Sequence, residues 1–266
     1  MHPIVDSHCH IYPEKIAERA VKGIGDFYSI PMSQGGTVKD MLKAEKLAGV
    51  THCIVFSVAT KVAQVESINR FIASEVQNAN GFMTGLGTLH PESTDIEGDV
   101  DLLLELGLKG VKLHPDIQGF KVDDYRCLKI YELCEKKGIP VLLHTGDTRY
   151  DFSNPNRVKP ILDTYTDLTV IGAHLGGWSM WDRAVDDLKG YKNFYVDCSS
   201  SLYAISPKKA TEVIRAYGAD RVMFATDYPM WSPKQELERF YALDLSKAEQ
   251  EQILYKTAEK LFKLKL

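Results

Sequence analysis

The chain has 266 residues, of which 44% are apolar, and its formal net charge is −4 at pH 7. This length can bury the core of one α/β barrel, so we expect a single domain over residues 1–266. The slightly acidic composition offers no overall positive field for nucleic acid or an anionic membrane surface. No apolar run reaches the roughly 20 residues of a membrane span, and residues 1–10 lack the pattern of a signal peptide, so we expect a cytoplasmic location.

Eight short runs rich in β-branched and other apolar residues recur along the chain, and each predicts a strand. They are Ile4–His8, Cys53–Val58, Phe82–Leu89, Gly110–Leu113, Val141–His144, Thr169–Ala173, Phe194–Asp197 and Val222–Ala225. Stretches with helical spacing follow them, at 37–49, 62–78, 95–107, 123–138, 156–166, 181–190, 207–218 and 246–264. We expect two longer stretches, 12–36 and 146–156, to be irregular and to form part of the active-site rim.

This alternation of strands and helices is typical of a parallel α/β fold, and eight units predict a (β/α)8 barrel of the TIM type, with room for distortion. A doubly wound open sheet is the competing architecture. It is disfavoured because no strand-to-helix turn carries a G-x-G-x-x-G phosphate loop. The cysteines are odd in number and lack C-x-x-C spacing, so we expect five reduced, buried thiols. They are Cys9, Cys53, Cys127, Cys134 and Cys198.

Titratable residues gather where the predicted strands end, which is where the active site of such a barrel lies. Five of the eight histidines fall in this group. Its members are Asp6, His8 and His10 of the first strand, Lys112 and His114 of the fourth, His144 of the fifth, His174 of the sixth and Asp227 of the eighth.

The H-x-H sequence of the first strand predicts a metal site, because alternate residues of a strand share a face. His8 and His10 then point into the barrel mouth, while Ser7 and Cys9 face outward. Asp6 is expected on the same face as the two histidines, where it could orient a ligand or hold a backbone turn.

Two further strand ends supply more donors. His144 adds a third imidazole, and Asp227 adds a carboxylate and a second expected catalytic group. This donor set predicts one divalent cation, with zinc expected and a second metal left open. Such a cation would lower the pKa of a bound water toward neutrality.

His174 is expected to act as the general acid/base, because it stands beside the donor set without a second histidine two residues away. Lys112 has three interpretations: an ion pair, a contact to a substrate acid, or a carbamylated bridge to a second metal. His114, Arg149 and Trp178 are candidate substrate contacts. The plainer alternatives are a hydrogen-bonded structural histidine at His114 and a helix N-cap at Asp227.

Four motifs in order, "DSHCH", "LLHTGD", "GAHLGG" and "FATDYP", resemble the amidohydrolase superfamily over essentially the whole chain. They are most similar to the branch that includes aminocarboxymuconate-semialdehyde decarboxylase and several hydrolases and lactonases. The resemblance implies a distorted (β/α)8 barrel with one divalent metal, usually zinc. It places the ligands on His8, His10, His144 and Asp227 and the proton-handling role on His174. Two-metal superfamily members carbamylate a lysine at the position of Lys112, so the metal count stays open.

The leading functional prediction is a metal-dependent hydrolase of a small amide, ester or lactone that uses a metal-activated water. The alternative is a metal-dependent nonoxidative decarboxylase of a small aromatic or unsaturated carboxylic acid, with Lys112, Arg149 or Arg157 holding the carboxylate. A TatD-like deoxyribonuclease ranks third, since that family calls for a glutamate where this chain has Lys112. A barrel that only binds a small acid or a protein ranks last. We expect a small-molecule substrate, no nucleic acid and no membrane, and leave a homodimer open.

Overall fold

The computed structural model describes residues 2–266. Its strands are β1 (Val5–His10), β2 (His52–Phe56), β3 (Met83–Gly85), β4 (Gly87–Thr88), β5 (Val111–Leu113), β6 (Val141–Leu143), β7 (Val170–Gly172), β8 (Phe194–Asp197) and β9 (Val222–Met223). Its α-helices are α1 (Glu14–Tyr28), α2 (Val38–Ala48), α3 (Val65–Asn78), α4 (Ile96–Glu105), α5 (Pro115–Gln118), α6 (Leu128–Lys137), α7 (Pro155–Thr164), α8 (Trp181–Leu188), α9 (Pro207–Tyr217), α10 (Pro233–Tyr241), α11 (Lys247–Glu251) and α12 (Thr257–Phe262).

All strand pairs are parallel and follow the chain order, in one sheet of β1 to β3 and a second of β4 to β9. The two sheets meet at Leu86, because its N–H donates to the carbonyl of Val55 at 2.9 Å while the next N–H, of Gly87, donates to Gly110 at 2.9 Å. The predicted third strand is therefore two short strands with a break at Leu86.

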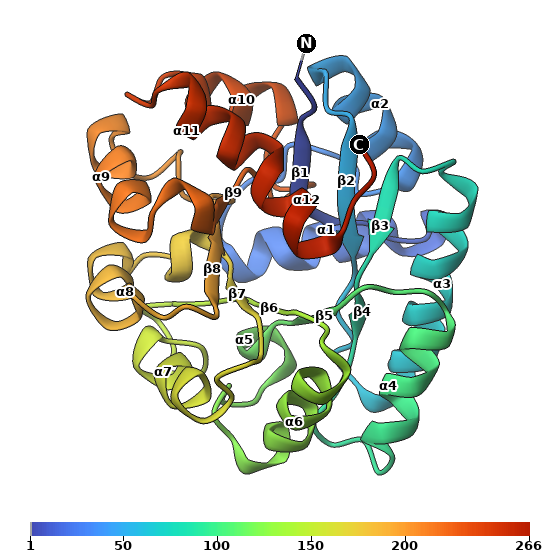
Figure 1. Cartoon of the computed structure of the whole chain (residues 1–266). Coiled ribbons are helices and arrows are strands. Elements are labelled where there is room, and N and C mark those ends of the chain that lie inside the picture. The colour runs from blue at the N-terminus through green and yellow to red at the C-terminus, as the bar shows by residue number, and fades with distance from the viewer. Residues whose placement is uncertain (1) are drawn as a thin grey trace.

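The first and last strands lie side by side, as a closed barrel requires. The Ser7 N–H donates to the Phe224 carbonyl at 3.0 Å, and the His10 N–H donates to the Tyr228 carbonyl at 2.7 Å. Figure 1 shows the strands at the centre of a ring of helices. The predicted (β/α)8 barrel is thus confirmed, with a distortion where the sheet divides.

The barrel interior is filled by apolar side chains from β1, β2 and β6 to β9 and from the break between β3 and β4, and these form a cluster with the C-terminal helix. These residues are Val5, Ile54, Phe56, Leu86, Leu142, Ile171, Tyr195 and Met223. Ala258 and Phe262 of α12 belong to the same cluster. Burying each aliphatic side chain of this kind contributes about 1.5–3 kcal/mol. The helix α12 thus packs against the interior of the barrel, whereas the titratable residues of the predicted site lie where the strands end.

The expectation of an irregular stretch at 12–36 is wrong, because α1 occupies most of it. Its apolar residues recur with helical spacing, from Ile16 and Ala17 to Ile24, although Gly23 and Gly25 weaken the local helix propensity. The helix ends at Ser29, whose backbone is left-handed, with φ 56°. Figure 1 shows α1 crossing behind the strands rather than packing in the outer ring.

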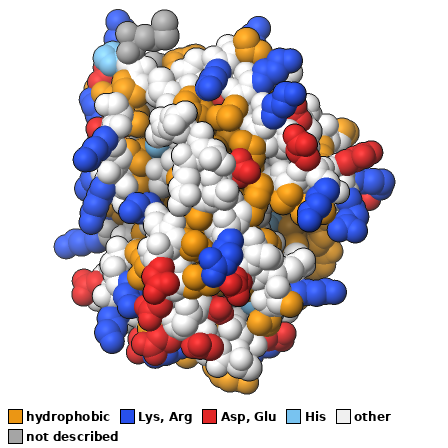
Figure 2. All heavy atoms as spheres, turned by 90° about the vertical axis from the view of Figure 1, so that its right-hand side faces the viewer, with side chains coloured by type: hydrophobic (Ala, Val, Ile, Leu, Met, Phe, Trp, Pro, Cys, Tyr) orange, Lys and Arg blue, Asp and Glu red, His pale blue; other side chains and the backbone are white. Residues whose placement is uncertain are grey.

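Other features of the described chain agree with the sequence. All five cysteines are buried and free, as expected. None of the helices within residues 2–266 combines the length and apolar character needed to cross a bilayer. Figure 2 shows basic and acidic side chains interspersed on the face formed by the right-hand side of Figure 1.

Candidate functional site

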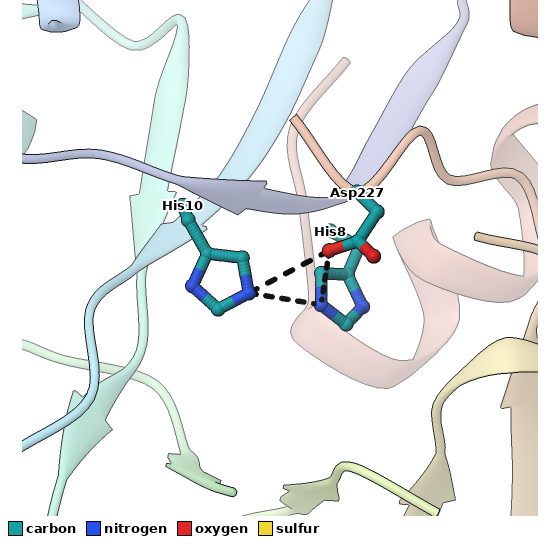
Figure 3. Close-up of side chains that lie close together, drawn as sticks. All are labelled: His8, His10 and Asp227. Atoms are coloured by element: carbon teal, nitrogen blue, oxygen red, sulfur yellow. Dashed lines mark hydrogen bonds and ion pairs between the residues drawn. The ribbon is translucent and has the colours of Figure 1, made fainter. Parts of the chain in front are cut away.

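The strand β1 and the loop after β9 bring two imidazoles and a carboxylate together, as predicted. The Nε2 atoms of His8 and His10 lie 3.3 Å apart, and Oδ1 of Asp227 lies 3.3 Å from the first and 3.6 Å from the second. Figure 3 shows the three groups turned toward one another. Ligand atoms at the corners of a tetrahedral zinc site lie about 3.4 Å apart for bonds of 2.0–2.1 Å. These three donors therefore have the spacing of groups that share one cation.

Asp6 does not join this triad, contrary to the expectation from strict alternation. A β-bulge shifts the register of β1 between Asp6 and Cys9, so the faces of the residues on either side of it no longer match. The Asp6 carboxylate accepts hydrogen bonds from the N–H groups of His8 and Thr226, each at 3.0 Å. Asp6 thus serves the second predicted role, which is to hold a backbone turn.

Asp197, at the end of β8, orients His8 and was not singled out from the sequence. Its Oδ2 accepts from Nδ1 of His8 at 2.8 Å, and its Oδ1 accepts from the N–H groups of His174 and Ser199, each at 3.1 Å. Burial would raise the pKa of Asp197, but the His8 and His174 rings outweigh it and hold the pKa below its usual range. Since the His8 proton sits on Nδ1, the Nε2 lone pair faces the triad. The strand-end rule could have identified this aspartate.

Asp227 is held in a strained backbone conformation by neighbours from two loops. Its φ is 62°, and His174 at the end of β7 has φ 61°, both in the left-handed region that non-glycine residues seldom occupy. Ser200 donates to Oδ2 of Asp227 at 2.5 Å, and the Trp231 indole donates to the Ser200 hydroxyl at 2.9 Å. The N-cap of α10 is Ser232, so the alternative of Asp227 as a helix cap is wrong.

His174 and His144 form a neutral pair beside the triad. Nε2 of His174 lies 3.0 Å from Nδ1 of His144, while Nδ1 of His174 faces the Ser199 carbonyl at 3.1 Å. Burial lowers the pKa of His174 to about 4, and burial together with the neighbouring His114 lowers the pKa of His144 well below its usual value. The carbonyl of Ser199 assigns the His174 proton to Nδ1, which leaves Nε2 as an acceptor.

The position of His144 leaves its ligand role a prediction. Within residues 2–266, the donor atoms that converge around the triad come from His8, His10 and Asp227, whereas His144 groups with His114 and Asp116. Nε2 of His144 lies 3.8 Å from the Asp116 carboxylate. Burial raises the pKa of Asp116 to about 6, and its Oδ1 has no hydrogen-bond partner among the described residues. Asp116 had not been singled out from the sequence.

Lys112 projects into the same space from β5. Its Nζ lies 3.4 Å from Nε2 of His8 and 5.2 Å from the centre of the Phe56 ring. Burial lowers the pKa of Lys112 to about 8, against the opposing effect of Asp197 and Asp227. In the part of the chain that the structure describes, no carboxylate oxygen forms an ion pair with Nζ, so the ion-pair interpretation lacks a partner.

The other three candidate substrate contacts, His114, Arg149 and Trp178, fall in different places. His114 lines the cavity, where its Nε2 lies 2.8 Å from the hydroxyl of Tyr28. Arg149 instead binds Asp147 at 2.7 Å and the carbonyl of Phe27 at 2.6 Å, and Trp178 packs edge-on against Tyr28. Tyr28 was missed because it belongs to the unpredicted helix α1.

These groups line a pocket that is partly open to solvent and whose cavity volume is about 20 Å³, room for little more than one water-sized molecule. One side is polar and carries the triad, Lys112 and the other histidines. The opposite side is apolar and comes mainly from α1 and the loops after β5 and β9. The apolar lining consists of Ile24, Met32, Ile117, Pro229 and Met230. The lining, polar on one side and apolar on the other, matches the chemistry of a small molecule with one charged end, although the pocket must widen to admit one.

The family model described as Amidohydrolase matches residues 5–264. This chain belongs to the amidohydrolase family. The match includes every motif that carried the resemblance, and it confirms the predicted branch together with the fold.

Known proteins similar to this amidohydrolase family member include decarboxylases. A 79-residue segment is 34% identical to 2-amino-3-carboxymuconate-6-semialdehyde decarboxylase of Dictyostelium discoideum, covering 29% of this chain and 22% of that protein. The solved structure of an uncharacterized TIM-barrel protein from Bordetella bronchiseptica superposes with a TM-score of 0.81 at 22% identity, over 97% of this chain and 98% of that one. The solved structure of a dihydroxybenzoic acid decarboxylase from Polaromonas, with bound manganese and the inhibitor 2-nitroresorcinol, superposes with a TM-score of 0.74 at 18% identity. The superposition covers 99% of this chain and 97% of that one.

Proposed function

We propose that this protein is a metal-dependent nonoxidative decarboxylase of a small aromatic or unsaturated carboxylic acid. The leading prediction from sequence was hydrolysis of an amide, ester or lactone, and the named relatives favour the alternative. The observation that carries the proposal is Lys112, which has no carboxylate partner among residues 2–266 and lies beside the His8, His10 and Asp227 triad in a pocket whose other side is apolar. Such a site can pair with a carboxylate while excluding water from it.

The donor set fits one divalent ion of the first transition row, with zinc or manganese as candidates. His8, His10 and Asp227 would hold it, and His144 remains the predicted fourth ligand. When bound, the ion would polarise the oxygen atoms of the substrate and stabilise the charge that develops on them.

The residues of the chain would divide the remaining work. Lys112 brings its Nζ beside the triad, where the substrate carboxylate can contact it, and that carboxylate favours the charged ammonium form. In the reaction, the bond between the substrate carbon and its carboxylate breaks, CO₂ leaves, and the electron pair stays on the carbon. That carbon then takes up one proton. His174, whose Nε2 is an acceptor, can receive a proton and pass it on.

The apolar wall supports decarboxylation over hydrolysis on physical grounds. Loss of CO₂ converts a localised carboxylate charge into a more delocalised one, which tolerates removal from water better. Hydrolysis requires that water reach the carbonyl and that a leaving group depart. Ile24 and Met32 of the α1 region and Met230 of the loop after β9 narrow the space through which the water or the leaving group would have to pass.

The test is a substrate screen of protein loaded with zinc or manganese and checked for metal content. Hydroxybenzoic and unsaturated acids are assayed for CO₂ release, and amides, esters and lactones for hydrolysis. We expect CO₂ release from at least one acid and its loss in Lys112→Met, with metal retained. Hydrolysis without any decarboxylation would refute the proposal, and so would full activity of Lys112→Met.

A further inference from the structure

We propose that Tyr28 is a substrate-contacting hydrogen-bond donor of this site, delivered by α1 and oriented by His114. The assignment deepens the proposed function and depends on it for the presence of a small oxygen-bearing acid. It makes Tyr28 a specificity-determining residue for an oxygen substituent on that acid.

The helix α1 brings the Tyr28 hydroxyl to the carboxyl ends of β5 and β6 from more than 80 residues away in the sequence. The hydroxyl oxygen lies 2.8 Å from Nε2 of His114 and 3.4 Å from Nε2 of His144. Tyr28 lines the cavity together with Ile24, one turn earlier on the same helix. The end of α1 thus contributes both apolar and polar surface to the site.

The Tyr28 ring is held on its outer side, so the position of the hydroxyl is well defined. Arg149 donates to the Phe27 carbonyl at 2.6 Å, and its guanidinium lies 5.1 Å from the centre of the Tyr28 ring. The buried Asp147 carboxylate fixes the guanidinium through a 2.7 Å contact. Trp178 packs edge-on at 5.1 Å between ring centres. Arg149 therefore anchors α1. This role explains why a charged residue lies close to the cavity without lining it.

The direction of the hydroxyl proton follows from the partners of His114. His114 caps α5, and its Nδ1 accepts from the N–H of Ile117 at 3.4 Å. A neutral imidazole with an acceptor at Nδ1 carries its proton on Nε2, which then donates to the Tyr28 oxygen. The Tyr28 proton must point elsewhere, and the acceptor it finds is Nε2 of His144 at the long distance of 3.4 Å.

That long contact is the one a substrate can replace. O–H···O hydrogen bonds are optimal at about 2.7–2.8 Å, so a phenolic or carboxylate oxygen in the cavity is a better acceptor than the distant ring nitrogen. The bond from His114 at 2.8 Å remains and polarises the hydroxyl in the donating direction. The inferred ligand class is a small carboxylic acid with a further oxygen substituent, such as a hydroxybenzoate.

The experiment compares wild type with Tyr28→Phe, which removes one oxygen and keeps the ring. Tyr150→Phe is the matched control, because Tyr150 stacks on Phe27 in the same aromatic group and does not line the cavity. KM, kcat and metal content are measured for the acid that wild type decarboxylates best and for its analogue without the hydroxyl. We expect Tyr28→Phe to raise KM for the hydroxylated acid about 10- to 100-fold, the usual effect of losing a hydrogen bond to a charged or polarised group.

The analogue separates a contact from a structural effect. In Tyr28→Phe the preference for the hydroxylated acid should collapse while metal content and the KM of the analogue stay the same, and Tyr150→Phe should match wild type. An unchanged KM in Tyr28→Phe, or an equal rise for both compounds, would overturn the assignment and leave the proposed function intact. If wild type hydrolyses an ester or lactone instead, the proposed function fails and the same pair of compounds is made for that substrate. If wild type turns over nothing, both are withdrawn.

Discussion

Replacing Asp197 by asparagine should weaken metal binding without removing any proposed ligand. The wild-type carboxylate accepts the Nδ1 proton of His8 at 2.8 Å, which keeps the Nε2 lone pair free. Its other oxygen is already occupied by the N–H groups of His174 and Ser199. The asparagine oxygen will keep those two bonds, so its NH₂ group must face His8. That donor opposes the Nδ1 proton and favours the tautomer protonated on Nε2.

Loss of an outer hydrogen-bond partner of this kind typically lowers metal affinity about 10- to 100-fold. The corresponding free energy of binding is roughly 1.4–2.8 kcal/mol. We expect the value to lie toward the upper end, because Asp197 is fully buried and water cannot replace the lost acceptor.

The assay is a competition titration of Zn²⁺ or Mn²⁺ against a chromophoric chelator at pH 7, with thermal unfolding as a check on folding. Asp186→Asn is the control, because it removes one negative charge from an exposed position on α8. If Asp197→Asn binds the metal as tightly as wild type and the control do, the hydrogen bond from His8 to Asp197 does not contribute to metal affinity.

Three further outcomes follow from the site and the core. The double variant His8→Ala with His10→Ala should lose the metal, and full retention would remove both from the ligand set. His174→Asn should keep stoichiometric metal while kcat falls on the order of 10²–10⁴-fold; loss of metal together with activity would make His174 a ligand instead. Burial raises the pKa of Glu236 to about 7, so the folded state loses stability as pH rises from about 4.5 to 7. At pH 8, Glu236→Gln should therefore raise the free energy of unfolding by up to about 3 kcal/mol, which thermal unfolding would show as a higher melting temperature than that of wild type. At pH 4.5 this gain should disappear. Glu238→Gln, on the exposed side of α10, should show neither effect.

Sequence patterns alone were enough to predict the barrel and most of the polar side of the site. Parallel strands with intervening helices follow from hydrophobic periodicity, which is a local property of the chain. Once the barrel is assumed, the strand-end rule brings His8, His10 and Asp227 together without any knowledge of their contacts. Lys112 and His174 follow from the same rule, and the structure places both beside the triad.

The alternation of side chains along a strand gave a wrong prediction where the register of β1 changes. Alternation placed Asp6 beside His8, but the bulge in β1 turned Asp6 to a different set of partners. A bulge inserts one residue relative to the neighbouring strand, so its position depends on pairing with β2 and not on the residues of β1 alone. Asp197 lies at the end of β8, as the strand-end rule requires, but it was not predicted because no histidine is close to it in the sequence.

The position of α1, which contributes Ile24 and Tyr28 to the pocket, depends on tertiary contacts that the sequence does not reveal. The position of α1 depends on Arg149 reaching the Phe27 carbonyl across 122 positions of sequence, on the Asp147 carboxylate that orients Arg149, and on Trp178 against the Tyr28 ring. Likewise, the contact between His144 and His174 exists because β6 and β7 are neighbours and both side chains turn inward. Local patterns specify which face of an element is apolar, but they do not specify which distant side chains meet there. That choice is made by packing among elements far apart in the chain, where many weak contacts must be satisfied at once.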